Sequence, residues 1–143
     1  MLIVDDALLL RVLALTAPDD ILDQARTGQV FTTGSWYYRL AKVVAQPRVA
    51  GALSSAMTAL PSDAEERARN GLRSLPPIIG MLDLRALVPT MAALDVGRPL
   101  NFLAAEAIAA AVLLDGGLVV STTSPLIEHA AAQLGLTCQL FHS

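Results

Sequence analysis

Charged and aromatic residues are scarce in this sequence. Only 16% of its 143 residues are charged and 54% are hydrophobic, whereas ordinary soluble domains have roughly 25% charged residues. The net charge is −3, only one of the ten basic residues is a lysine, and no basic run occurs. This composition excludes a dedicated nucleic-acid binder of high pI. It also implies more apolar surface than one small domain hides, so we expect a homodimer or a protein partner.

The sequence also lacks the cysteines and the long apolar runs of other classes. Its single cysteine, Cys138, cannot form an intramolecular disulfide, which agrees with a cytoplasmic location. The most apolar stretch, residues 102–120, is interrupted by Glu106, Asp115 and a Gly-Gly pair, so we expect no membrane span. The first residues carry acids and no basic segment, so we expect no signal peptide. No P-loop, GxGxxG, HExxH or Ser-elbow pattern occurs.

Short apolar runs alternate with helical patterns along what we expect to be a single domain, residues 1–143. The predicted strands are residues 1–4, 30–32, 78–82, 118–121 and 136–141. The predicted helices are residues 7–15, 19–26, 35–44, 49–59, 64–72, 84–94, 100–114 and 125–134. Pro47 is expected to separate the third helix from the fourth. This alternation predicts an α/β fold, a three-layer α/β/α sandwich with a mainly parallel central sheet.

Two acidic residues directly follow the first predicted strand. Asp5 and Asp6 come after the apolar residues 1–4, and open parallel sheets bind ligands at the carboxyl ends of their strands. Carboxylates at such a place are suited to hold Mg²⁺ or Mn²⁺. In the alternative interpretation, Asp6 caps the following helix and Asp5 accepts hydrogen bonds from loop amides.

Glu106 is a single acid on an otherwise apolar helix face, FLAAEAIAAAVLL. Burying an unpaired carboxylate is costly, so Glu106 must meet a cation, a hydrogen-bond network, solvent or a metal ion. Asn101, just before this helix, could share a site with Glu106 or simply cap the helix.

Four hydroxyl residues lie between a predicted strand and the start of the last helix. Thr122, Thr123 and Ser124 precede free helix N–H groups, a suitable place for a phosphate. In the alternative interpretation, Ser124 is only the N-cap before Pro125.

The segment from Trp36 to Arg39 gathers the only tryptophan and both tyrosines of the chain. Aromatic rings beside arginine can stack on nucleic-acid bases or form a protein-interface hot spot. We select Trp36, Tyr37 and Arg39 as candidate nucleic-acid contacts. In the alternative interpretation, one or two of the rings belong to the core. His129 and His142 fit no metal-ligand spacing, and we expect both on the surface.

Taken together, these segments resemble the PIN domain family, metal-dependent endoribonucleases best known as bacterial toxin components. LIVDDALL is similar to the opening strand of the family, and EAIAAAVLLDGGLVVSTTS to its closing pattern. The resemblance covers nearly the whole chain. It implies Asp5 as the first acid of the site and Glu106 as the third, with Ser124 where the family has its fourth.

The chain departs from the family where a second acid is expected. VFTTGSWYYRLA offers Trp36 or Tyr37 there, and Ala7 replaces a small hydroxyl residue. The resemblance thus implies a reduced Mg²⁺ or Mn²⁺ site, with Asp5 and Glu106 catalytic and Asp6 as a further metal ligand. Asp5 and Glu106 would lie within about 8 Å of each other to share one hydrated ion.

Losing two of four acids favours a weakly active or inactive ribonuclease that binds nucleic acid or a protein, such as an antitoxin-like partner. The first alternative is an active toxin-type ribonuclease acting on RNA through Asp5 and Glu106. The second is a flavodoxin-like or other phosphate-binding domain.

Overall fold

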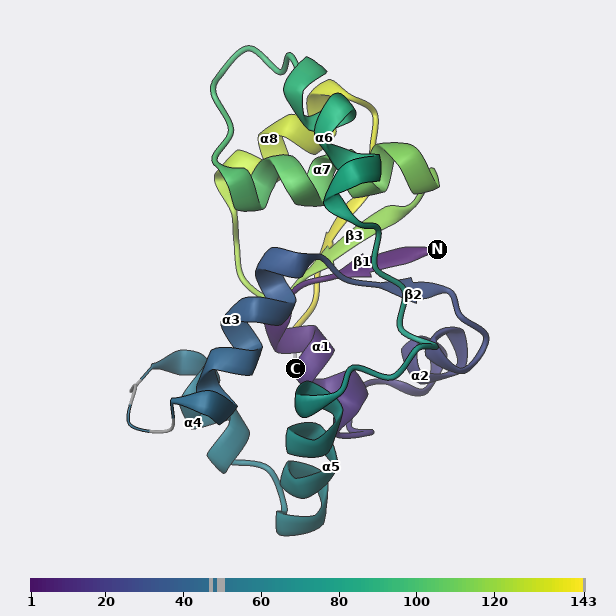
Figure 1. The fold of residues 1–143 in the computed structure, drawn as a ribbon. Coiled ribbons are helices and arrows are strands. Elements are labelled where there is room, and N and C mark those ends of the chain that lie inside the picture. Colours follow the sequence, from purple (N-terminus) through teal and green to yellow (C-terminus); the bar gives the residue numbers. More distant parts are fainter. Residues whose placement is uncertain (47, 49–50, 143) are drawn as a thin grey trace.

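The computed structural model describes residues 1–46, 48 and 51–142. Figure 1 shows the described elements, which alternate between short strands and helices. Their order is β1 (Leu2–Val4), α1 (Asp6–Leu13), α2 (Asp19–Arg26), β2 (Val30–Phe31), α3 (Gly34–Ala45), α4 (Ala52–Thr58), α5 (Ser62–Arg73), α6 (Leu84–Ala93), α7 (Phe102–Leu114), β3 (Gly117–Val120), α8 (Pro125–Gln133) and β4 (Cys138–Leu140).

The four strands form one parallel sheet in the order β2-β1-β3-β4. Leu2 pairs with Val30 on one side and with Gly117 on the other, and Leu118 pairs with Cys138. From β1 the chain moves outward to β2, and from β3 it moves outward to β4. The sheet therefore has a topological switch point between β1 and β3, and the carboxyl ends of all four strands lie at one edge.

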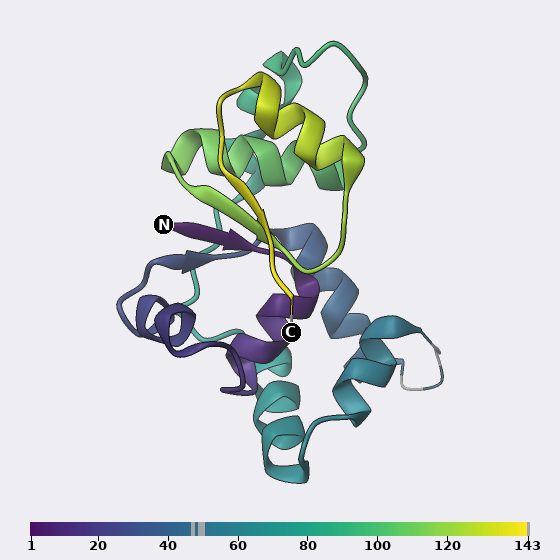
Figure 2. The same ribbon diagram turned by 180° about the vertical axis from the view of Figure 1, so that it is seen from behind.

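Helices cover both faces of the sheet, which confirms the predicted three-layer α/β/α sandwich (Figures 1 and 2). Alternate strand residues point into two hydrophobic cores. Val4 and Val119 pack with α1, α2 and α5 on one face. Ile3 and Leu118 pack with α7 and α8 on the other face. Strands buried on both faces read as continuous apolar runs, as the sequence does here.

Most helix ends follow the local sequence signals. Gly28 and Gly135 adopt the left-handed conformation just beyond α2 and α8, with φ of 75° and 69°, as glycines after helices commonly do. α2 begins at Asp19, and Pro18 takes the N-cap position without a side-chain hydrogen bond. Pro47 lies outside the described residues.

The predicted central strand at residues 78–82 is wrong. Only Gly80 makes an isolated parallel bridge, with Phe31. Its N–H donates to the carbonyl of Val30 at 2.9 Å, so this segment runs beside β2 at the edge of the sheet. A Cβ atom at Gly80 would lie 2.3 Å from the Phe31 ring, so the close approach requires glycine here. No described helix is long and apolar enough to cross a membrane.

Candidate acidic site at the carboxyl ends of the strands

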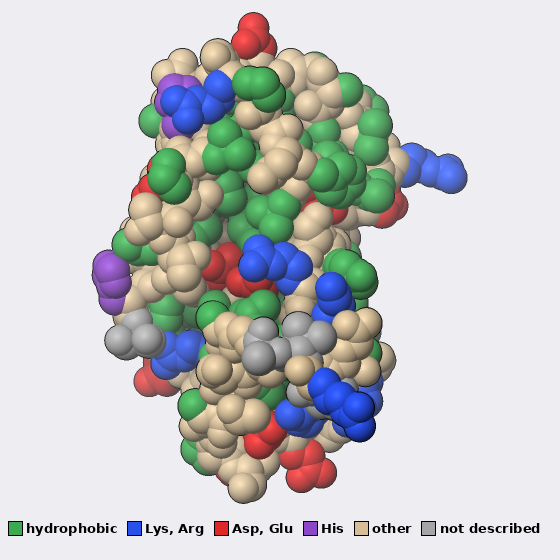
Figure 3. All heavy atoms as spheres, turned by 90° about the vertical axis from the view of Figure 1, so that its left-hand side faces the viewer, with side chains coloured by type: hydrophobic (Ala, Val, Ile, Leu, Met, Phe, Trp, Pro, Cys, Tyr) green, Lys and Arg blue, Asp and Glu red, His purple; other side chains and the backbone are tan. Residues whose placement is uncertain are grey.

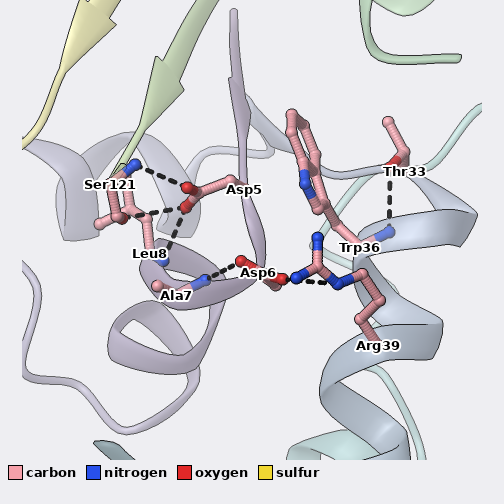
Figure 4. Close-up of polar contacts among 8 residues, drawn as sticks. All are labelled: Asp5, Asp6, Ala7, Leu8, Thr33, Trp36, Arg39 and Ser121. Atoms are coloured by element: carbon pink, nitrogen blue, oxygen red, sulfur yellow. Dashed lines mark hydrogen bonds and ion pairs between the residues drawn. The ribbon is translucent and has the colours of Figure 1, made fainter. Parts of the chain in front are cut away.

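Asp5 lies at the end of β1 and accepts three hydrogen bonds, shown in Figure 4. Its Oδ1 accepts from the N–H of Leu8 at 3.0 Å and from the hydroxyl of Ser121 at 3.0 Å. Its Oδ2 accepts from the N–H of Ser121 at 2.6 Å. The side chain is 4% exposed. Asp5 therefore caps α1 and joins that helix to the residue that follows β3.

Asp6 begins α1 and faces Arg39 of α3 across the same edge (Figure 4). Its Oδ1 accepts from the N–H of Ala7 at 2.8 Å, and its Oδ2 lies 3.4 Å from Nε of Arg39. Burial raises the pKa of the Asp6 carboxyl above its usual range, with a smaller contribution from the charge of Asp5, and the guanidinium of Arg39 opposes this rise. Arg39 therefore supplies the nearest positive charge to Asp6.

Glu106 is buried on α7, with 2% of its surface exposed. Its Oε1 accepts from the backbone N–H of Ser35 at 2.9 Å. A Cβ atom at Gly34 would lie 3.3 Å from Oε2. The carboxylate thus lies at the N-terminus of α3, where the unpaired N–H groups and the helix dipole favour negative charge. One hydrogen bond from the backbone of α3 thus gives the buried Glu106 a partner.

These three acids do not form a three-carboxylate metal centre. Among the described residues, no group of three or more His, Cys, Asp or Glu is arranged to hold a metal ion. Asp5 binds Leu8 and Ser121, whereas Glu106 binds Ser35, so the two carboxylates share no hydrogen-bond partner. Three of the roughly four lone-pair sites of the Asp5 carboxylate already accept protein hydrogen bonds. The described residues thus contain no three-acid centre, and a Mg²⁺ or Mn²⁺ site with fewer acids stays a prediction.

The hydroxyl residues after β3 have mainly structural contacts. Ser121 binds Asp5, and Oγ of Ser124 accepts from the N–H of Ile127 at 3.5 Å, as the N-cap of α8. Thr122 and Thr123 are exposed to solvent. Asn101 likewise caps α7 by accepting from the N–H of Ala104 at 2.8 Å. Ser124 and Asn101 thus follow the capping interpretation, and nothing in these contacts marks a phosphate site.

The aromatic segment divides between the core and the surface. Trp36 is 3% exposed and packs in the core that contains α7, so its selection as an accessible nucleic-acid contact is wrong. Tyr37 packs against the other core and donates from its hydroxyl to the carbonyl of Leu72 at 2.9 Å, which also makes it unsuited to stacking. Tyr38 is 64% exposed. The helical rotation of about 100° per residue turns neighbouring rings to different sides.

Our selection omitted Tyr38 and Lys42 of α3, which contact each other. Nζ of Lys42 lies 5.6 Å from the centroid of the Tyr38 ring, a cation–π contact. Lys42 and Arg39 also line a hollow of about 260 Å³ together with Val43, Leu53 and Ser54. The (i, i+4) spacing of Tyr38 and Lys42 was the sequence signal for this contact.

The two histidines differ in their surroundings. A ring nitrogen of His129 lies 3.0 Å from the carbonyl oxygen of Val96, and this residue is partly exposed. His142 is exposed, as expected.

Comparisons with protein-family models, with curated proteins and with solved structures find no match. The case for a function therefore depends on the residues and contacts described above.

Proposed function

We propose that this chain is a PIN-like binding module that lacks efficient ribonuclease chemistry and binds single-stranded nucleic acid through α3. One observation carries the proposal: both oxygens of Asp5 accept hydrogen bonds from the protein, so the first acid of the expected site serves the fold. The three-layer parallel fold agrees with the resemblance. The contacts of Asp6 with Arg39 and of Glu106 with Ser35 support the same conclusion.

The surface of α3 supports nucleic acid as the ligand. Tyr38 presents an exposed ring on which a base can stack, Lys42 places a positive charge beside that ring, and Arg39 lines the same hollow as Lys42. The Arg39 side chain remains 56% exposed despite its ion pair with Asp6. Figure 3 shows basic side chains gathered on the half of this side that contains α3 and α4. A few cations on a chain of net charge −3 predict modest, salt-sensitive binding.

Binding is tested by fluorescence anisotropy with a labelled 12-nucleotide oligouridine at low salt. Tyr38→Ala removes the stacking ring, so we expect roughly 5–160-fold weaker binding, equivalent to about 1–3 kcal/mol per base. Lys42→Gln should weaken binding and reduce the salt dependence. The matched control is Arg26→Gln, since Arg26 is also exposed and pairs only with Asp23 on α2. If the Tyr38, Lys42 and control variants bound the oligouridine with equal affinity, this result would contradict nucleic-acid binding at this surface.

The chemistry is tested separately by titrating Mg²⁺ and Mn²⁺ in a calorimeter and by incubating the protein with structured and single-stranded RNA. We expect weak or no metal uptake, since the protein already uses the oxygens of Asp5. We also expect little or no cleavage. Tight metal binding together with cleavage abolished by Asp5→Asn would overturn the proposal and support the toxin-type ribonuclease.

We also predict that the chain self-associates. We expect the protein in the cytoplasm, with Cys138 reduced. The exposed apolar side chains on α6 and α7 support self-association, namely those of Leu84, Val88 and Phe102. Figure 3 shows hydrophobic side chains on the half that contains these helices. Sedimentation velocity at micromolar concentration should show a species heavier than 15.0 kDa. A clean monomer would contradict a homodimer and leave an antitoxin-like protein as the partner to test by co-purification.

A further inference from the structure

A second hollow, separate from the α3 surface, opens at the carboxyl ends of β1, β3 and β4. It has a volume of about 440 Å³ and is lined by Ala7, Leu10, Arg11, Ala56, Leu60, Ser121, Phe141 and His142. Ser121 directly follows β3, and Phe141 directly follows β4. This is the edge at which the strand order reverses between β1 and β3, the position where open α/β sheets hold their ligands. The volume lies within the range of small-molecule sites.

Arg11 provides the charge in this hollow. Its Nη2 donates to the carbonyl of Thr16 at 2.7 Å, and its guanidinium lies 5.2 Å from the centroid of the Phe141 ring. Its Nη1 is buried and has no hydrogen-bond partner among the described residues. Within those residues Arg11 also forms no ion pair, in contrast to Arg26, Arg39, Arg67 and Arg69. A half-buried cation is thus held by one carbonyl and one aromatic face.

The other residues that line the hollow determine which chemical groups can bind beside Arg11. Leu10, Leu60, Ala56 and Phe141 are apolar, and a charge beside apolar walls is less screened than one in water. The hydroxyl of Ser121 donates to Asp5, so toward the hollow it can act only as an acceptor. His142 lies exposed at the rim. Asp5 is not among the residues that line the hollow, and its two oxygens accept from Leu8 and Ser121.

From these contacts we infer that the hollow binds a small organic anion, with its charged group toward Arg11 and an apolar body against Leu10, Leu60 and Phe141. A carboxylate and a phosphate monoester share this chemistry. The site is independent of the nucleic-acid surface, because it shares no lining residue with the hollow beside Arg39 and Lys42.

The test titrates the ¹⁵N-labelled full chain with benzoate, phenyl phosphate and the neutral benzyl alcohol, followed by two-dimensional NMR. We expect saturable shifts at Arg11, Leu60 and Ser121 for at least one anion, and at least tenfold weaker binding of benzyl alcohol. The preferred anion identifies carboxylate or phosphate as the recognised group. Equal binding of anions and alcohol would overturn the inference, as would no binding of either anion at 10 mM, a concentration on the order of ten times a weak Kd of 1 mM.

Variants then locate the site. Arg11→Gln should weaken the anion at least tenfold. Because this variant also loses the contact with Thr16, Ala56→Phe provides an independent test, since it fills the hollow from an exposed position on α4. The matched control is Ala59→Phe, which is exposed just after the same helix and does not line the hollow. Loss of binding in Ala56→Phe but not in Ala59→Phe supports the site; unchanged binding in Ala56→Phe contradicts it.

Discussion

Asp5 and Ser121 are 116 residues apart in the sequence and are joined by two hydrogen bonds, from the backbone N–H of Ser121 at 2.6 Å and from its hydroxyl at 3.0 Å. The contact connects the ends of β1 and β3, the two inner strands of the sheet. Because Asp5 also caps α1, one carboxylate holds three elements together. Loss of this carboxylate would leave three donors without their acceptor, so the residue is hard to replace.

Asp5→Ala should lower the free energy of unfolding by about 3–5 kcal/mol, because it removes a helix cap and leaves buried donors without acceptors. Urea denaturation followed by circular dichroism measures this loss. The matched control is Asp83→Ala, which removes the exposed N-cap of α6 and should cost about 1 kcal/mol. If Asp5 served mainly as a metal ligand, its removal in metal-free buffer would relieve repulsion, and the variant would be as stable as the wild type or more so.

Glu106→Gln should be tolerated far better than Glu106→Leu. The glutamine carbonyl still accepts from Ser35, whereas leucine leaves that N–H unpaired beside the start of α3, a loss of about 1–3 kcal/mol. Thermal unfolding of the two variants measures the difference. Equal destabilisation by both would show that the negative charge of Glu106, rather than its acceptor oxygen, is what the fold requires.

Asp6→Asn should change the dependence of stability on pH. The pKa of Asp6 is raised in the folded chain, mainly by burial, so the folded state binds more protons than the unfolded state between the usual and the raised pKa. The wild type therefore loses stability as the pH rises through this window, and the asparagine variant does not. We expect the stability of Asp6→Asn relative to wild type to increase with pH across the window and then to level off.

Arg39→Gln is the companion variant for this measurement. Arg39 lowers the pKa of Asp6, so its loss should move the decline in stability to higher pH. A decline at the same pH in Arg39→Gln and in the wild type would contradict the coupling of these two residues. Urea denaturation between pH 3 and pH 8 provides both curves.

Gly80→Ala should destabilise the chain by about 1–3 kcal/mol, the usual cost of forcing an added group into a packed site. Its Cβ would lie 2.3 Å from the ring of Phe31. Gly51→Ala is the control, because no atom of the described residues beyond its chain neighbours lies within 4 Å of the added Cβ, and it should change stability by less than about 0.5 kcal/mol. Equal stability of the two variants would mean that Phe31 moves aside at no cost.

Local sequence signals were enough to predict the helices and several of their ends. The capping side chains of Asn101 and Ser124 act within three residues of their own position, so short segments contain all the information they need. The apolar runs at β1 and β3 likewise predicted buried parallel strands, since only a sheet covered on both faces requires them. Glu106 was recognised as constrained because a carboxylate among apolar residues needs a partner, and Asp5 because it directly follows an apolar strand.

Only the tertiary structure determined which residues bind the carboxylates of Asp5 and Glu106. Ser35 reaches Glu106 across 71 residues, and Ser121 reaches Asp5 across 116, because the strand order and the packing of α3 against α7 bring them together. The same packing buries Trp36 and exposes Tyr38, although only Tyr37 separates these two residues in the sequence. The sequence by itself determined which residues needed a partner or a buried place, through local hydrogen bonding and hydrophobicity. The three-dimensional packing determined which contact each one obtained, because such contacts join segments whose proximity no local signal records.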